Sequence, residues 1–303
     1  MEQASYLLLS ATHAMKYPLC FAIYYNRQAW SDLLKNCLAP ILQQLKTESG
    51  YSGYTLYFCK EQGEHLRLEL HLQSMDQQKI QLYQSTIEEF ITAHPTQRLD
   101  KPLPIHDSFF LDLPNNSVYT NTFKPALPHT AHIAPPEVAF IRKEISALML
   151  EAFAENPVDQ DALFNFYLCL QIVALGVFGS PLSTVAEILR EDHKKLAARL
   201  PKEEVRRLEL EADKLIKNNF ADLNELLALA EYGHYSADTE WLWAWEQACK
   251  QISRTTAPMS LFRDINRSIC QHIDLHRGKW SALGLTIIKS LITNQNRLIH
   301  YTS

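Results

Sequence analysis

One stretch of the sequence places polar side chains at every second position: His65, Arg67, Glu69 and His71. The residues between and after them, at positions 66, 68, 70 and 72, are all leucine. Successive side chains of a strand point to opposite faces, so the pattern predicts a strand with one leucine face and one ionisable face. Such a face can hold a carboxylate or a developing oxyanion, with Arg67 as a bidentate clamp and His65 or His71 as the acid or base. The alternative is a half-buried strand whose polar face is merely solvated.

The elements around this strand follow a regular order over the first 125 residues. They are a strand at 19–25, a helix at 30–45, strands at 54–59 and 66–72, a helix at 80–94 and a strand at 117–123, each assigned from its hydrophobic period. Gly50 and Gly53 bracket a turn, after which the second and third strands can pair as a hairpin. Pro40 is expected to kink the first helix, and Pro95 to follow the end of the second. The order βαββαβ predicts a split βαβ, ferredoxin-like sheet with helices on one face.

The rest of the chain is predicted to be helical. Prolines 125, 128, 135 and 136 mark a boundary, which divides the chain into an α+β module (1–134) and a larger all-α module (135–303), with a peptide cleft between them. Helices are expected at 137–153, 159–177, 183–189, 202–217, 222–230, 239–252, 260–272 and 281–294. The apolar run 163–178 contains Asn165 and Gln171 and is shorter than the roughly 20 residues of a bilayer crossing, which indicates a core helix.

Composition excludes several classes of function. The 303 residues are 47% hydrophobic, enough for a sizeable core, and the net charge of −5 offers no bulk basic surface for nucleic acid. Six cysteines without a CxxC pair indicate reduced thiols, and the short apolar run Tyr6–Leu9 lacks the basic flank of a secretory signal. We therefore expect a cytosolic protein without a membrane span, and no metal or organic cofactor is implied.

Three further patterns have simpler interpretations. His272 and His276 are four residues apart, but no third ligand is evident, so an ordinary helix-end pair is favoured over a zinc site. The tryptophans at 241, 243 and 245 cannot share one helix face, which favours core packing with one exposed indole over an aromatic peptide groove. The charged run 203–211 is typical of a solvated helix face.

Several segments together resemble one protein family. They are Phe21–Tyr25, Tyr57–Lys60 and Glu64–Leu68 in the first half, and Ser290–Ile292 and Asn296–Leu298 near the end. In this order they look like landmarks of the thiopeptide-type bacteriocin biosynthesis domain, which also forms the elimination half of lantibiotic dehydratases. The resemblance implies an enzyme of lyase type that acts on a leader-bearing, ribosomally made precursor peptide. It also implies a separate glutamylating dehydratase subunit as a partner, and it leaves a homodimer open.

In that family a partner domain glutamylates Ser or Thr, and the elimination domain expels glutamate to leave dehydroamino acids. The resemblance assigns catalytic roles to Arg67 and Arg297, together with His65 and His71. It places Lys60, Glu69, Lys124 and Asn296 at the substrate. Glu69 stands where the family has a second arginine, Lys60 stands for the arginine of the preceding strand, and Thr293 and Asn294 replace a His-Met pair.

Three activities stay open after these departures. The first is glutamate elimination. The second is the formal 4+2 cyclisation of two dehydroalanines, with release of water and leader, that related pyridine synthases perform. The third is noncatalytic binding of the precursor, in which Arg67 and Arg297 clamp its carboxylates.

Overall fold

The structure is a computed structural model of the chain. It describes residues 18–60, 62–72, 77–97, 113–122, 135–178, 200–232, 239–252, 258–273 and 282–292, with isolated positions between 189 and 198. Contacts divide the chain into two units. Unit 1 comprises residues 1–127 and 150–157, and unit 2 comprises residues 128–149 and 158–303.

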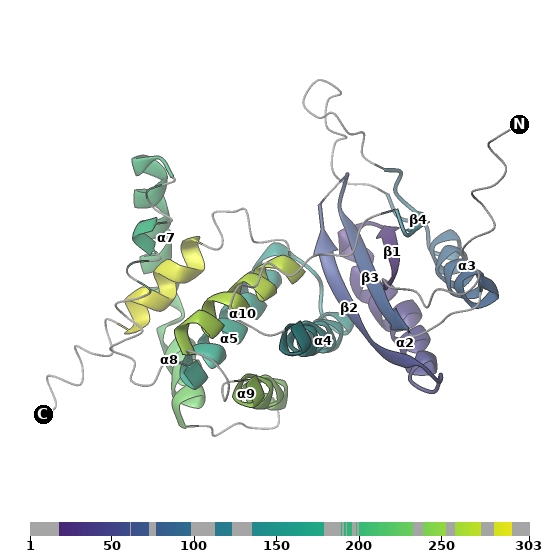
Figure 1. Ribbon diagram of the computed structural model, residues 1–303. Helices are drawn as coiled ribbons and strands as arrows, with labels where there is room; N and C mark the ends of the chain where they lie inside the picture. The colour runs from purple at the N-terminus through teal and green to yellow at the C-terminus, as the bar shows by residue number, and fades with distance from the viewer. Residues whose placement is uncertain are drawn as a thin grey trace, which may run out of the picture. The chain divides into compact units, whose positions relative to one another are not determined.

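Unit 1 is built on a four-stranded sheet (Figure 1). Its strands are β1 (Leu19–Tyr24), β2 (Tyr51–Cys59), β3 (His65–Leu72) and β4 (Ser117–Thr120). They lie in the order β2-β3-β1-β4, and every neighbouring pair is antiparallel. This is the order of a split βαβ sheet, so the predicted fold class and the β2–β3 hairpin are confirmed.

The first helical segment of unit 1 contains a wide turn just before its proline. A short 3-10 turn, η1 (Arg27–Ala29), leads into α1 (Trp30–Leu33), the π-helical turn η2 (Leu34–Leu38) and α2 (Ala39–Leu45). The N–H of Ala39 reaches back five residues to the carbonyl of Leu34. Pro40 has no N–H to donate and its ring would clash with a regular preceding turn, so the widened turn makes room for the proline.

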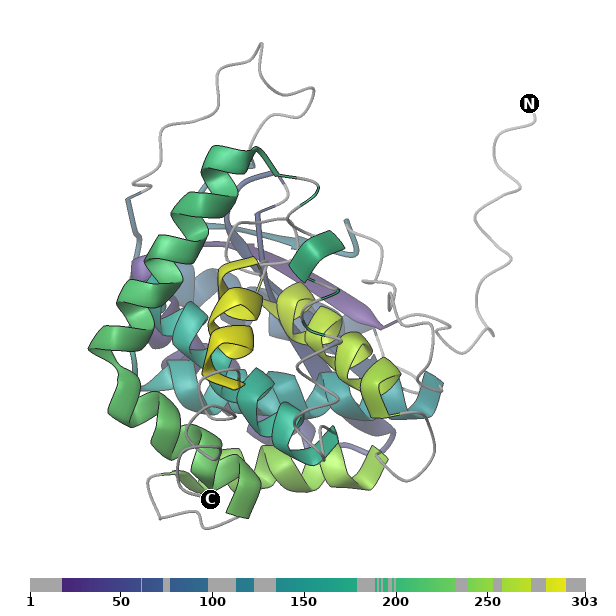
Figure 2. The same ribbon diagram turned by 90° about the vertical axis from the view of Figure 1, so that its left-hand side faces the viewer.

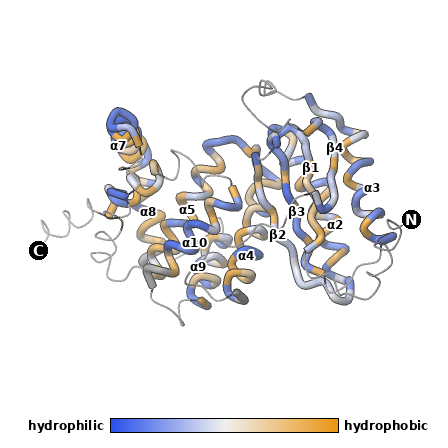
Figure 3. The backbone as a smooth tube through the Cα atoms, turned by 45° about the horizontal axis from the view of Figure 1, so that its top comes forward, coloured by the Kyte–Doolittle hydropathy of each residue, from blue (hydrophilic) through white to orange (hydrophobic). Residues whose placement is uncertain are grey.

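The leucine face of β3 forms the core of unit 1. Leu66, Leu68 and Leu70 are fully buried. Burying a leucine is worth about 1.5–3 kcal/mol, so these three side chains stabilise the sheet substantially. The helices cover this face: the ring of Trp30 in α1 packs against that of Phe58 in β2, with 4.9 Å between the ring centroids. Helix α3 (Gln77–Ala93) lies beside β4 and buries one side only, with hydrophobic and hydrophilic positions alternating along it (Figure 3).

The secondary structure described in unit 2 consists of helices. Its helices are α4 (Pro135–Ala154, whose last turn belongs to unit 1), α5 (Gln160–Phe178), α7 (Lys202–Asn218), α8 (Phe220–Tyr232), α9 (Glu240–Ile252), α10 (Pro258–His272) and the helix Ala282–Ile292. Helix α7 passes through a short break at Asn219 into α8 (Figure 2). Helix α5 is long and apolar enough to cross a membrane by composition, but it packs against α8, α9 and α10, as a core helix does.

Two predictions for the helices of unit 2 are confirmed. Trp245 is buried and donates its indole N–H to the Leu170 carbonyl at 2.8 Å, whereas Trp243 is 48% exposed. The charged run of α7 faces solvent.

The predicted boundaries of two strands in unit 1 are corrected. Strand β2 begins at Tyr51 rather than at 54, with Gly53 inside it, and β4 ends at Thr120 rather than at 123. The helix predicted at 183–189 lies mostly outside the described residues.

The packing of Gly284 gives a prediction about unit 2. A Cβ at this position would lie 2.4 Å from Cε1 of Tyr167. Because the Tyr167 ring is fully buried, it cannot swing away into solvent. Gly284→Ala is therefore expected to lower the free energy of unfolding by about 1–3 kcal/mol, measured by urea denaturation. The control is a double-mutant cycle with Tyr167→Leu, which removes the clashing ring. An equal cost of Gly284→Ala on both backgrounds would contradict the prediction.

Candidate functional site

The face of the sheet opposite the leucines carries the polar groups, and we call it the polar sheet face. The strand registers place these side chains on it: Cys20, Ala22 and Tyr24 of β1, Thr55, Tyr57 and Cys59 of β2, His65, Arg67, Glu69 and His71 of β3, and Ser117 and Tyr119 of β4. The four predicted residues of β3 therefore do share a face, and three tyrosines surround them. Sequence reasoning did not identify the contributions of β1, β2 and β4.

Burial decides between the two interpretations of this face. The exposed fractions are 0% for His65, 6% for Arg67 and 1% for Glu69, while His71 at the end of the strand is half-buried. The alternative of a merely solvated face is therefore wrong. Buried ionisable groups are costly unless they are paired or hydrogen-bonded, so each of them requires a specific surrounding.

His65 is held as a neutral imidazole. Its Nδ1–H donates to the carbonyl of Gly63 at 3.0 Å, and its ring stacks on Tyr24 at 4.6 Å between centroids. Burial lowers the pKa of His65 to about 4, an effect that the Gly63 carbonyl opposes and the positive charge of Arg67 reinforces. With Nδ1 protonated, the lone pair of the neutral ring lies on Nε2. Gly63 has φ 107°, a conformation that favours glycine in this turn.

A second arrangement joins Glu69 to His71 through a residue that sequence reasoning missed. Thr55 faces Glu69 across the β2–β3 ladder, and its hydroxyl lies 3.2 Å from Glu69 Oε2. The same hydroxyl lies 3.1 Å from His71 Nε2. A buried carboxylate is thus connected through one hydroxyl to a half-buried imidazole. Predicting this arrangement would have required the register of the hairpin.

The cysteine on this face does not supply a nucleophile. Burial raises the pKa of Cys20 to about 12, and the negative charge of Glu69 raises it further than Arg67 lowers it. The thiol therefore stays protonated at neutral pH, and a thiol is a poor nucleophile. All six cysteines have free thiols.

Of the other predicted site residues, one is exposed and three lie outside the described residues. Lys60 is exposed at the β2–β3 turn, where its carbonyl accepts a hydrogen bond from the Gly63 N–H at 3.3 Å. Lys124, Asn296 and Arg297 are these three residues, so the expected role of Arg297 as a second cation beside Arg67 stays a prediction.

His272, the other histidine considered for metal binding, is a buried structural residue. Its ring Nδ1 lies 2.6 Å from the Ser268 carbonyl, and burial together with the charge of Arg142 lowers its pKa to about 3. His276 lies outside the described residues. Among the residues with described positions, no three His, Cys, Asp or Glu side chains gather as a metal ion would need.

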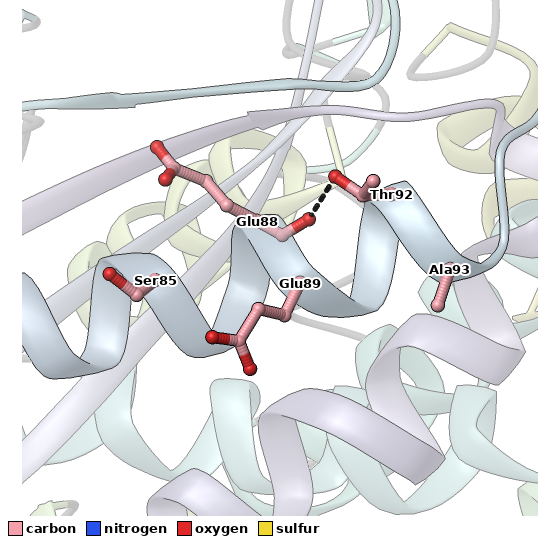
Figure 4. Close-up of a pocket in the computed structure, with 5 residues that line it drawn as sticks. All are labelled: Ser85, Glu88, Glu89, Thr92 and Ala93. Atoms are coloured by element: carbon pink, nitrogen blue, oxygen red, sulfur yellow. Dashed lines mark hydrogen bonds between the residues drawn. The ribbon is translucent and has the colours of Figure 1, made fainter.

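A separate surface hollow lies along α3 (Figure 4). Ser85, Glu88, Glu89, Thr92 and Ala93 line it, and the Thr92 hydroxyl donates to the Glu88 carbonyl at 2.7 Å. These five residues include no histidine or cation, and the hydroxyl is already used within the helix. The hollow therefore offers little chemistry compared with the polar sheet face.

Comparisons with known proteins agree with the resemblance noted in the sequence. A family model described as the C-terminal part of lantibiotic biosynthesis dehydratases matches residues 19–301. The structure is similar to that of TbtD, a pyridine synthase from thiomuracin biosynthesis, with a TM-score of 0.68 and 14% identity over 93% of this chain and 100% of that one. It also matches the tRNA-dependent lantibiotic dehydratase MibB from Microbispora sp., with a TM-score of 0.48 and 16% identity over 95% of this chain and 29% of that one. No curated protein sequence matches the chain.

The neutral state of His65 predicts a dependence of stability on pH. Unfolding restores the ordinary histidine pKa of 6.5, so between about pH 6.5 and 4 the unfolded chain binds more protons than the folded one. The free energy of unfolding should therefore decrease as the pH is lowered through this window, by up to about 3 kcal/mol for His65 alone. His65→Gln should make this fall shallower in urea denaturation at pH 7 and 4.5. The exposed His94→Gln serves as the control, and an equal slope in both variants would refute the assignment.

Proposed function

We propose that this chain, which belongs to the C-terminal family of lantibiotic biosynthesis dehydratases, matures a ribosomally made precursor peptide by closing a ring between its dehydroamino acids. The observation that carries the proposal is the buried pair of opposite charges on the polar sheet face, Arg67 at 6% and Glu69 at 1% exposure. The peptide would lie with its reacting segment against this face, and its leader would be released with water when the ring closes.

Arg67 supplies the cation that such chemistry needs. Ring closure and the following elimination place negative charge on amide carbonyl oxygens of the peptide. A guanidinium can donate two parallel hydrogen bonds to such an oxygen or to a neighbouring carboxylate. Because Arg67 is largely removed from water, each of these interactions is stronger than it would be on an open surface.

Glu69 argues against glutamate elimination. The departing glutamate carries negative charge, and the resemblance places a second arginine of the eliminating domains at this position. Here the position holds a carboxylate that is 1% exposed, two residues from Arg67 on the same face. Like charges in a poorly solvated site repel each other, so a substrate without a glutamyl group is favoured. The fold similarity to a pyridine synthase over nearly the whole of both chains supports the same choice.

The proposal implies a place for the chain in a sequence of reactions. Its substrate already contains dehydroamino acids, so a glutamylating dehydratase subunit must act before it on the same leader-bearing precursor. All of this chemistry depends on glutamyl-tRNA and a newly made peptide, which are cytosolic, and we place the protein there.

The test uses purified full-length protein and two synthetic precursors, one dehydrated and one glutamylated, with products followed by mass spectrometry. We expect the dehydrated precursor to lose its leader and water, and the glutamylated precursor to stay unchanged. Arg67→Ala is expected to lower kcat/KM for ring formation on the order of 10²-fold, because it removes a cation used in the transition state. Arg67→Lys should recover part of this loss.

The controls separate the remaining activities. Arg206→Ala changes an exposed arginine on α7 and should leave the rate unchanged. Loss of glutamate from the glutamylated precursor would establish elimination instead. Binding of either precursor without a mass change, weakened by Arg67→Ala, would establish a noncatalytic partner. Circular dichroism of each variant confirms that a lost rate does not reflect a lost fold.

A further inference from the structure

The link from Glu69 through Thr55 to His71 fixes where protons lie. An ionised carboxylate only accepts hydrogen bonds, so the Thr55 hydroxyl donates to Glu69 across their 3.2 Å contact. A hydroxyl has a single proton and can then only accept from His71, 3.1 Å away. The nitrogen that faces Thr55 is Nε2, so Nε2 carries a hydrogen. In the neutral ring the lone pair is consequently on Nδ1.

The backbone of β2 makes room for this arrangement. Gly53 is the residue opposite His71 in the ladder, and the register shifts between Tyr51 and Gly53, as in a β-bulge. A residue with no side chain opposite His71 lets the imidazole lean toward Thr55, its diagonal neighbour on the same face. Gly53 has φ 127°, a conformation that other residues rarely adopt. The Ser52 hydroxyl also donates to the His71 carbonyl at 3.0 Å, which holds the end of the strand.

We propose that Thr55 is a positioning residue which, by donating to Glu69, holds His71 in the Nε2–H form and so makes Nδ1 of His71 the proton acceptor of the site. For the identity of the substrate this inference rests on the proposed function. In ring closure the Nδ1 atom takes the proton of a peptide amide N–H and returns it to the carbonyl oxygen of the same amide. The amide becomes its C=N tautomer, with no net gain or loss of protons.

The positive charge that forms on the His71 ring during this transfer is stabilised by Glu69. The imidazolium still donates from Nε2 to Thr55, and Thr55 still donates to the carboxylate, so no hydrogen bond has to be rearranged. A base that is oriented by a third group in this way assists proton transfer. The other charged and titratable groups that the described strands bring to this face are His65 and Arg67 on β3, Tyr57 and Cys59 on β2, Cys20 and Tyr24 on β1, and Tyr119 on β4. Cys20 stays a neutral thiol.

His71 suits this role better than His65. His65 is 0% exposed and its ring lies under Tyr24, so a peptide would have to displace that stack to reach it. His71 is only half-buried at the end of β3, and its ring contacts a hydroxyl rather than lying beneath an aromatic ring. The two histidines also have opposite protonated nitrogens, Nδ1 in His65 and Nε2 in His71. His65 is then a neutral neighbour of Arg67, and His71 is the group that exchanges protons.

The test measures the protonated nitrogen of His71 directly. Protein labelled with ¹⁵N-histidine is studied by ¹H–¹⁵N correlation NMR at pH 8, with His71→Gln to assign the signals. The expected result is the Nε2–H form in the wild type, a mixture of both forms in Thr55→Val, and the wild-type pattern again in Thr55→Ser. Thr120→Val is the matched control, because this sheet threonine bonds Gln84 of α3 on the other face. An Nδ1–H form in the wild type, or an unchanged pattern in Thr55→Val, overturns the proposal.

Kinetics with the dehydrated precursor give a second measurement. Thr55→Val is expected to lower kcat by about 10-fold or more with KM changed by less than about two-fold, and Thr55→Ser to recover most of the rate. A wild-type rate in Thr55→Val overturns the role in proton transfer. If the wild type shows no turnover, the proposed function fails while the NMR result still decides the tautomer. If Thr55→Val does not fold, the wild-type spectrum alone decides it.

Discussion

Strand β3 is buried on both faces, although only one of its faces is apolar. The leucines at 66, 68 and 70 are fully buried, and so is His65, while Glu69 and Arg67 are nearly so. An ionisable group without water must find a hydrogen bond or an opposite charge, or it becomes neutral. In unit 1 these needs are met in different ways. His65 is neutral and bonds a glycine carbonyl, and Glu69 accepts from Thr55. Arg67 lies on the same face as Glu69, whose charge is opposite.

The sequence was sufficient to predict the sheet because the signals for it are local. Alternation marked β3, aromatic and β-branched runs marked β1 and β2, and the order of elements left few topologies besides the split βαβ. The errors lie where backbone geometry, rather than residue type, sets the boundary. Gly53 was interpreted as a turn residue because glycine is common in turns, but it lies in a bulge within β2. The widened turn before Pro40 follows a known cause, but its position within the helix could not be deduced.

The candidate site was predictable along one strand and not across strands. His65, Arg67, Glu69 and His71 share a face because a strand has a period of two, a property that can be read from sequence alone. Thr55 and Tyr24 belong to the same face only through the registers that β2 and β1 adopt against β3. A shift of either register by one residue would have turned both side chains to the other face. Burial was also beyond the sequence, since alternating polar residues usually indicate a solvated surface.

The separation of core and chemistry within one strand explains how such a fold can change its reaction. The helices described in unit 1 pack on the leucine face, so substitutions at odd-numbered positions of β3 leave that packing intact. They are nevertheless not independent of one another, because the polar face is also buried. A carboxylate at position 69 requires a donor, and Thr55 is the residue opposite it in the ladder. An arginine at position 69 would leave the Thr55 hydroxyl facing another donor and would remove the acceptor that orients it toward His71. A change of substrate charge at this site therefore has to involve β2 and β3 together.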